Sequence, residues 1–132
     1  MPQAIDLVAL FRRKERSNAI VDRGGFRSPH CDMCGKTNAT DYHEIASRGR
    51  TMNNNAARTY SFHRELCAFL CNQCHLNSAH NPKVAEKLLL KNCKRYGWLK
   101  VRTHYDALES LMKTGIHGIP FPPDPDNRYP EE

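Results

Sequence analysis

The chain has 132 residues, a formal net charge of +6, and 39% hydrophobic against 26% charged residues. A chain of this length is expected to form one domain, and a core this small usually needs an added cross-link or metal ion to be stable. No apolar run approaches transmembrane length, which excludes a membrane-spanning protein.

The charge is unevenly spread along the chain. Four acidic residues and one arginine lie in the last nine positions, so the rest of the chain carries about +9. A basic body of this size predicts a polyanionic partner, with nucleic acid ahead of an acidic membrane surface. The apolar stretch from Ala4 to Phe11 is short, contains Asp6 and lacks a cleavage-like end. We therefore expect a cytoplasmic protein, in which thiols stay reduced.

The first half of the chain predicts one helix and one strand. Residues 4–16 have helical periodicity, with Ile5, Val8 and Phe11 on a broad apolar face that runs into a basic cluster. A short strand is predicted over residues 40–46 and a polar loop over 51–58. Residues 60–70 are compatible with either strand or helix.

The second half predicts two further helices. Pro82 suits the first turn of a helix that ends before Gly97, and residues 101–113 hold the helical period again. From residue 119 onward, five prolines and several acidic residues predict a flexible tail. The expected organisation is a single α+β domain over residues 1–118, followed by the Pro-rich acidic tail, 119–132.

The cysteines predict a structural zinc site. Two Cys-x-x-Cys pairs, Cys31/Cys34 and Cys71/Cys74, each supply two thiolates at a spacing that suits a tetrahedral ion. Cys67 with Cys71 is an alternative second pair, but 71/74 repeats the spacing of the first. Cys93 falls on an apolar helical face and is expected in the core. Because a site closed by four thiolates leaves no position for a substrate, this zinc is expected to be structural.

Histidines and carboxylates gather beside both cysteine pairs. Asp41-Tyr42-His43-Glu44-Ile45 lies between the pairs, and His75 and His80 follow the second one. On a strand, Asp41 and His43 would share one face. Phosphodiester hydrolysis needs a base with a pKa near neutral and a cation to offset negative charge, and these residue types supply both.

Taken together, Cys-x-x-Cys-Gly, the His-Glu-Ile strand with its Arg-Gly turn, and Leu70-Cys71-x-x-Cys74-His75 resemble the zinc-containing HNH (ββα-metal, His-Me finger) endonucleases, especially phage-type members. The resemblance covers about residues 30–82. It implies a small ββα-metal catalytic core with a four-Cys structural zinc clamp, flanked by N- and C-terminal helices. It also implies one catalytic divalent cation, such as Mg²⁺, Mn²⁺, Ni²⁺ or Zn²⁺, and DNA as the substrate.

The resemblance leaves the roles of two residues open. In one register His43 is the general base, and Asp41 and His75 bind the metal. In the other register His43 binds the metal, and Glu44 occupies the position of the base. His80 is either a further ligand or a surface histidine. The asparagine usual in the middle of the family's motif is absent; His63, Glu65 or one of Asn53–Asn55 is a candidate replacement.

Four arginines bracket the expected site and are candidate phosphate contacts: Arg48, Arg50, Arg58 and Arg64. The resemblance is compatible with a homodimer, and with a phage-encoded enzyme acting in a bacterial host cell. Two other functions also fit the sequence. One is a zinc-ribbon module that binds nucleic acid without cleaving it, and the other is a partner in phage packaging or recombination.

Overall fold

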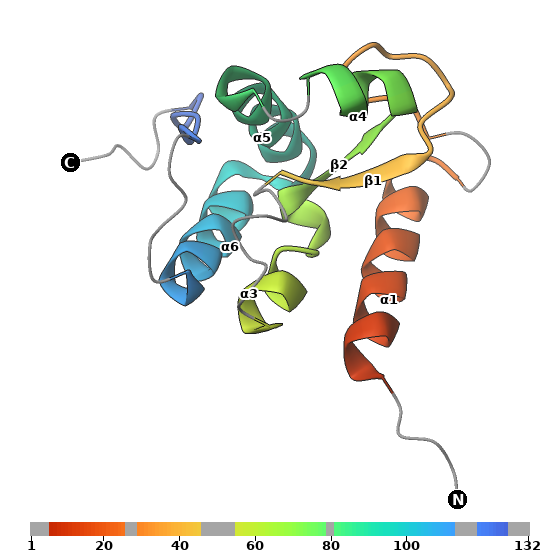
Figure 1. Cartoon of the computed structure of the whole chain (residues 1–132). Coiled ribbons are helices and arrows are strands. Elements are labelled where there is room, and N and C mark those ends of the chain that lie inside the picture. Colours follow the sequence, from red (N-terminus) through yellow and green to blue (C-terminus); the bar gives the residue numbers. More distant parts are fainter. Residues whose placement is uncertain (1–5, 26–28, 46–54, 79–80, 113–118, 127–132) are drawn as a thin grey trace, which may run out of the picture.

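A computed structural model describes residues 6–25, 29–45, 55–78, 81–112 and 119–126 (Figure 1). It combines helices with one small antiparallel sheet, so the α+β class is confirmed. In chain order the elements are α1 (Leu7–Asp22), β1 (Asp41–Glu44), α3 (Asn55–Tyr60), the 3₁₀ helix η1 (Arg64–Leu66), β2 (Cys67–Leu70), α4 (Asn72–Ser78), α5 (Pro82–Tyr96) and α6 (Trp98–Leu111). No helix in the described ranges is long and apolar enough to cross a membrane.

The two strands pair antiparallel, with Asp41 opposite Leu70 and Glu44 opposite Cys67. Side chains alternate between the faces of a strand, so Asp41 and His43 share one face of β1 while Tyr42 and Glu44 share the other. α4 follows β2 directly and lies beside the sheet, and α1 stands on its other side (Figure 1).

The hydrophobic core lies between the sheet, α5 and α6. Leu70 of β2, Leu88 and Leu89 of α5, and Val101 and Leu108 of α6 are each at most 2% exposed. Cys93 is 4% exposed and belongs to this core, as its place on the apolar face of the helix predicted.

Helix ends follow local capping chemistry. Asp6 accepts a hydrogen bond from the backbone N–H of Ala9 at the start of α1, and Asn81 accepts one from Lys83 at the start of α5. Gly97 ends α5 with φ of +99° and begins α6 directly. The predicted helix over 82–96 is confirmed, whereas α6 begins three residues earlier than expected.

Two segments differ from the predictions. The ambiguous stretch 60–70 holds the end of α3, then η1, then β2, so neither a single helix nor a single strand was correct. α1 continues to Asp22, and the first apolar residues of the helix, Leu7, Val8 and Leu10, are exposed rather than packed.

The beginning of the expected tail packs against α6. Trp98 Nε1 donates a hydrogen bond to the carbonyl of Pro122, and the Tyr105 hydroxyl donates one to the carbonyl of Ile119, both at 2.9 Å. Ile119 is 7% exposed. The tail from residue 119 is therefore part of the packed body over at least its first residues.

Candidate metal centre

The four cysteines of the two Cys-x-x-Cys pairs converge on one point. The sulfurs of Cys31, Cys34, Cys71 and Cys74 all lie within 4.8 Å of one another. Each pair forms the same turn, because the N–H of the fourth residue approaches the first sulfur: Cys34 N to Cys31 Sγ at 3.5 Å, and Cys74 N to Cys71 Sγ at 3.4 Å. Gly35 follows with φ of +78°, which lets the backbone turn behind the first pair.

The surroundings shift the pKa values of two cysteines in this cluster in opposite directions. Although burial opposes ionisation of Cys31, backbone N–H groups of Cys34, Cys71 and Met33 lower its pKa to about 6. Hydrogen bonding to the neighbouring cysteines raises the pKa of Cys74 to about 12. Four sulfurs at these separations fit a tetrahedral zinc ion.

Cys67 is outside the cluster. Its thiol is fully buried and donates to the carbonyl of Ser61 at 3.3 Å, and burial raises its pKa well above the ordinary value. The second pair is therefore Cys71 with Cys74, and the alternative pairing of Cys67 with Cys71 was wrong.

Asp32, between the first two cysteines, anchors the cluster to the rest of the fold. Its backbone N–H donates to the Phe69 carbonyl at 2.8 Å, and its side chain accepts from the N–H of Phe69 at 3.0 Å. The same carboxylate lies 3.5 Å from Arg23, which follows the last residue of α1, and 3.2 Å from Arg95 of α5. No sequence pattern pointed to this residue, because its partners are distant along the chain.

Beside the cysteines, β1 and α4 bring three of the predicted site residues together. His75 Nδ1 lies 2.9 Å from Asp41 Oδ2. The ring of His43 meets that of His75 edge-on, with centroids 5.0 Å apart. His43 is only 4% exposed, whereas the side chains of Asp41 and His75 are 25% and 33% exposed.

The Asp41–His75 contact determines which nitrogen of His75 carries the proton. The hydrogen bond from His75, with another from Thr40, lowers the pKa of Asp41, so the carboxylate is ionised at neutral pH and can only accept. His75 Nδ1 must therefore donate, and in neutral imidazole Nε2 keeps its lone pair. A carboxylate that orients a histidine in this way is typical of metal-binding and proton-transfer sites.

No family model matches the chain, and neither a curated protein nor a solved structure was found to be similar to it.

Glu44 lies on the opposite face of β1 from Asp41 and His43. Its carboxylate forms an ion pair with Arg12 of α1 at 2.6 Å and accepts a hydrogen bond from Ser61 at 3.3 Å. These contacts join α1 to the sheet and direct the Glu44 carboxylate toward α1 rather than toward His75. This placement favours His43 over Glu44 for chemistry on the His75 side.

Two of the four arginines predicted to contact phosphates, Arg58 and Arg64, lie among the described residues. Arg58 is half-buried in α3, and its carbonyl accepts from Arg12 and Ser61. Arg64 forms ion pairs with Asp22 at 2.6 Å and Glu65 at 3.3 Å, which ties η1 to α1. His80, Arg48, Arg50, Asn53 and Asn54 lie outside the described residues.

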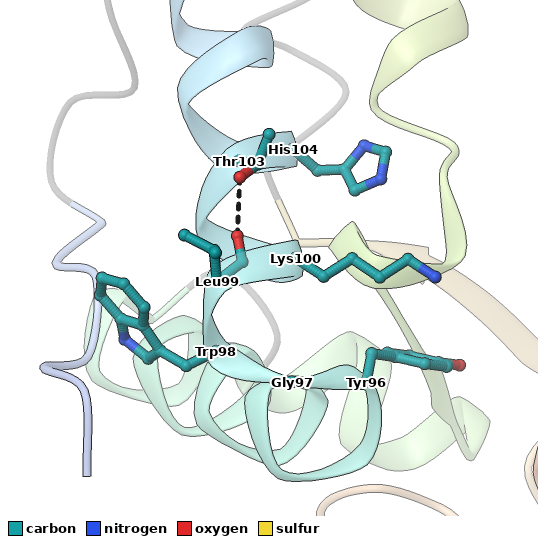
Figure 2. A pocket seen from close by; sticks show the side chains of 7 residues that line it. All are labelled: Tyr96, Gly97, Trp98, Leu99, Lys100, Thr103 and His104. Atoms are coloured by element: carbon teal, nitrogen blue, oxygen red, sulfur yellow. Dashed lines mark hydrogen bonds between the residues drawn. The ribbon is translucent and has the colours of Figure 1, made fainter. Parts of the chain in front are cut away.

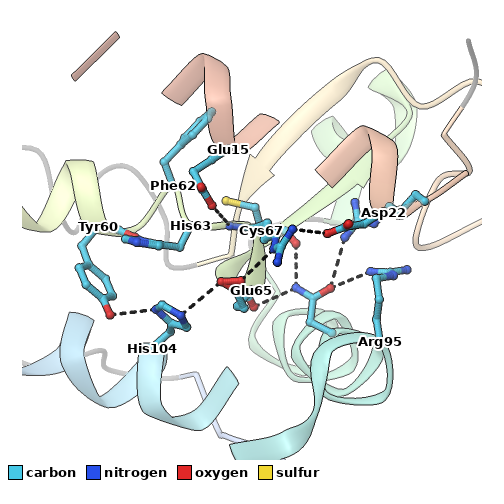
Figure 3. Close-up of polar contacts among 12 residues, drawn as sticks. Glu15, Asp22, Tyr60, Phe62, His63, Glu65, Cys67, Arg95 and His104 are labelled. Carbon is cyan, nitrogen blue, oxygen red and sulfur yellow. Dashed lines mark hydrogen bonds and ion pairs between the residues drawn. The ribbon is translucent and has the colours of Figure 1, made fainter. Parts of the chain in front are cut away.

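Two candidates for the missing asparagine, Glu65 and His63, belong to a separate network (Figure 3). Glu65, which is 3% exposed, lies 3.3 Å from His104 Nε2, and His104 Nδ1 lies 2.8 Å from the Tyr60 hydroxyl. His63 Nδ1 donates to the Tyr60 carbonyl at 2.6 Å. Burial lowers the pKa of His104, so the neutral ring accepts from Tyr60 and donates to Glu65. This network joins α3, η1 and α6.

Sequence reasoning also missed an open pocket where α5 meets α6. It is lined by Tyr96, Trp98, Leu99, Lys100 and His104, and the Thr103 hydroxyl donates to the Leu99 carbonyl at 2.7 Å (Figure 2). None of Asp41, His43 or His75 lines it. Within the described ranges, the four cysteines are the one group of three or more Cys, His, Asp or Glu side chains whose ligand atoms converge.

Proposed function

We propose that the protein is a metal-dependent DNA endonuclease of the HNH type, whose catalytic residues lie on β1 and α4 beside a structural zinc site. One observation supports this proposal most strongly: Asp41, His43 and His75 meet on one side of an antiparallel strand pair and the helix that follows it. The same strand–strand–helix order, next to four cysteines, is what the sequence resemblance implies.

The residues at this point fit a hard divalent cation. Carboxylate oxygen and imidazole nitrogen are suitable ligands for Mg²⁺, Mn²⁺ or Ni²⁺. Because His75 Nδ1 donates its proton to Asp41 Oδ2 at 2.9 Å, the ring would bind the ion through Nε2, which keeps its lone pair. Asp41 would fix the orientation of this ring, and His80 is a further candidate ligand. A bound cation would offset charge on the scissile phosphate and on the departing oxygen.

The protein's own residues would then perform three tasks. Asp41 would keep the His75 ring in one orientation, His75 would bind the cation, and His43 would accept the proton of the attacking water. The water oxygen would form a bond to phosphorus as the bond to the leaving 3′ oxygen breaks, and that oxygen would take a proton from solvent water. The zinc site would hold β1, β2 and α4 rigid enough to keep these groups aligned.

The test is cleavage of supercoiled plasmid by the zinc-loaded protein, with Mg²⁺, Mn²⁺, Ni²⁺ or Zn²⁺ added separately. Metal-dependent nicking is expected, and His75→Ala and Asp41→Asn should each reduce its rate by on the order of 10²–10⁴-fold, as for loss of a catalytic group. Asp106→Asn, an exposed carboxylate on α6, is the matched control and should cut at the wild-type rate.

His43→Gln separates the two roles that the sequence left open for this residue. If His43 is the base, the variant should lose cleavage while its affinity for the added ion, measured by calorimetry, stays unchanged. If His43 is a metal ligand, the variant should lose both cleavage and affinity for the ion. If no ion supports cleavage of duplex, single-stranded or branched DNA by folded, zinc-containing protein, the nuclease proposal is wrong.

A non-catalytic zinc module that binds DNA is the second candidate. It is favoured by the fact that, among the described residues, the cysteines alone form a converging ligand set. Binding of duplex DNA without cleavage under every metal condition would establish this alternative.

A further inference from the structure

One face of α5 carries a row of lysines that belong neither to the cysteine cluster nor to the group of Asp41, His43 and His75. Lys83, Lys87, Lys91 and Lys94 are all exposed. At 100° per residue, these four side chains fall within an arc of about 80° of the helix, and Arg95 lies about 40° beyond it. Glu86, the one acidic residue of α5, falls about 60° outside the arc on the other side. We refer to Lys83, Lys87, Lys91, Lys94 and Arg95 as the α5 basic stripe.

Most of this charge is not neutralised within the molecule. Within the described parts of the chain, no ion pair joins Lys83, Lys87 or Lys94 to a carboxylate. Lys91 donates to the backbone carbonyl of Asp32, a contact that positions its ammonium without cancelling its charge. A surface lysine that is paired with a carboxylate adds little to the net potential around it. A row of lysines on one side of a helix, without such partners, creates a local positive potential.

The stripe continues into a pocket beside the first cysteine pair. Arg95 and Arg23 line this pocket with His30, and the two guanidinium groups share the single carboxylate of Asp32. Asp22 also lines this pocket, but its carboxylate forms an ion pair with Arg64. The Arg23 side chain is 5% exposed, its Nη1 lies 3.5 Å from Asp32 Oδ2, and its Nε has no hydrogen-bond acceptor among the described residues. With two guanidinium groups against one carboxylate, this pocket at the Arg95 end of the stripe keeps an excess of positive charge.

The dimensions and packing of α5 suit a rigid polyanion. Eleven residues separate Lys83 from Lys94, which is about 16 Å along the helix and on the order of five phosphates of one DNA strand. The apolar side of α5 is buried through Ala85, Leu88 and Leu89. An interfacial membrane helix would need that side to insert into lipid, whereas contact with phosphates needs the lysine side alone.

We infer that the α5 basic stripe is the main surface that holds the DNA backbone. This inference rests on the proposed function for the choice of DNA as the ligand. It does not depend on catalysis, because binding through phosphates requires no cleavage. The contacts would be sequence-independent, since phosphates carry no base information.

The test compares two triple variants of the full, zinc-loaded chain with the wild type. Lys83→Gln/Lys87→Gln/Lys94→Gln removes three charges from the stripe, and Arg13→Gln/Lys14→Gln/Arg16→Gln removes three exposed charges from α1. Binding to a fluorescent 30-base-pair duplex is measured by anisotropy between 50 and 200 mM salt, without added divalent ion. Unchanged zinc content and melting temperature confirm that each variant is folded.

The stripe variant should bind about tenfold or more weakly, and its slope of log K against log salt should be smaller by about 2.7, or about 0.9 for each phosphate that is no longer neutralised. The α1 variant should change the slope by less than about 0.9, the value for a single phosphate. Equal reductions in both variants would mean that only net charge matters, and would overturn the inference.

Other results separate this inference from the nuclease proposal. An unchanged slope in the stripe variant, with normal plasmid cleavage by the wild type, overturns the stripe and leaves the nuclease standing. A reduced slope without any cleavage supports the stripe and contradicts the nuclease. Failure of the wild type to bind duplex at 50 mM salt, or tighter binding to phosphatidylserine vesicles than to DNA, overturns the inference.

Discussion

Asp32 connects more parts of the molecule than any sequence pattern suggested. It lies between two cysteines of the metal-site cluster, and its side chain is 6% exposed where it meets Arg23 and Arg95. A carboxylate buried against two guanidinium groups is stabilising only as a set, because each member compensates the desolvation of the others.

Asp32→Ala should therefore lower the free energy of unfolding by about 3–5 kcal/mol, the cost of leaving buried charges without a partner. Urea unfolding of the zinc-loaded protein measures this change. Asp106→Ala, which breaks an exposed i,i+4 pair with Arg102, is the control and should cost no more than about 1 kcal/mol. Similar effects in both variants would show that the Asp32 cluster is not coupled to stability.

At the scale of elements, α5 was predicted most accurately. Asn81 and Pro82 lie at its first turn and Gly97 lies at its end. Such end signals act on the neighbouring backbone alone, so they can be read from the sequence without knowledge of the packing. The segment 60–70 stayed ambiguous, because three elements of three to six residues meet there and none is long enough to establish a period.

In the candidate site, too, the features set by local sequence were predicted and those set by long-range packing were not. The spacing of the cysteines predicted their convergence, since each pair is a local turn. The alternation of β1 predicted that Asp41 and His43 share a face. The pairing of Glu44 with Arg12, 32 residues away, depends on where α1 packs, and no local pattern carries that information.

Gly97 controls the corner between α5 and α6. Its φ of +99° with ψ of 135° lies in a region that other residues rarely adopt, although a Cβ there would meet no atom within 4 Å. Gly97→Ala should therefore cost about 1–3 kcal/mol from backbone strain alone. Chemical denaturation measures the effect, and Lys100→Ala on the adjacent turn should change stability by less than about 0.5 kcal/mol. A cost below that limit in Gly97→Ala would mean that the corner relaxes freely.

For the whole molecule, the cysteine cluster joins segments 37 residues apart, and the strand pair lies between them. Structural zinc sites bind with about 10–16 kcal/mol, as much as the total stability of a typical domain of about 5–15 kcal/mol. Folding and metal binding should therefore be a single event.

Cys34→Ser should abolish bound zinc and the cooperative thermal transition, because three thiolates hold the ion poorly. Zinc per chain by mass spectrometry and melting by circular dichroism measure both. Cys93→Ala, in the core but outside the cluster, is the control and should retain about one zinc per chain with a lower melting temperature. A folded Cys34→Ser protein without zinc would show that the metal is dispensable for the fold.

The positions of the four ligands along the chain also bear on biosynthesis. All of them precede residue 75, whereas α5 and α6, which cover the core side of β2, come later. As the ribosome releases the chain from its N-terminus, the thiolates emerge before these helices exist. A metal ion would therefore be able to bind the nascent chain before α5 and α6 are available to cover β2.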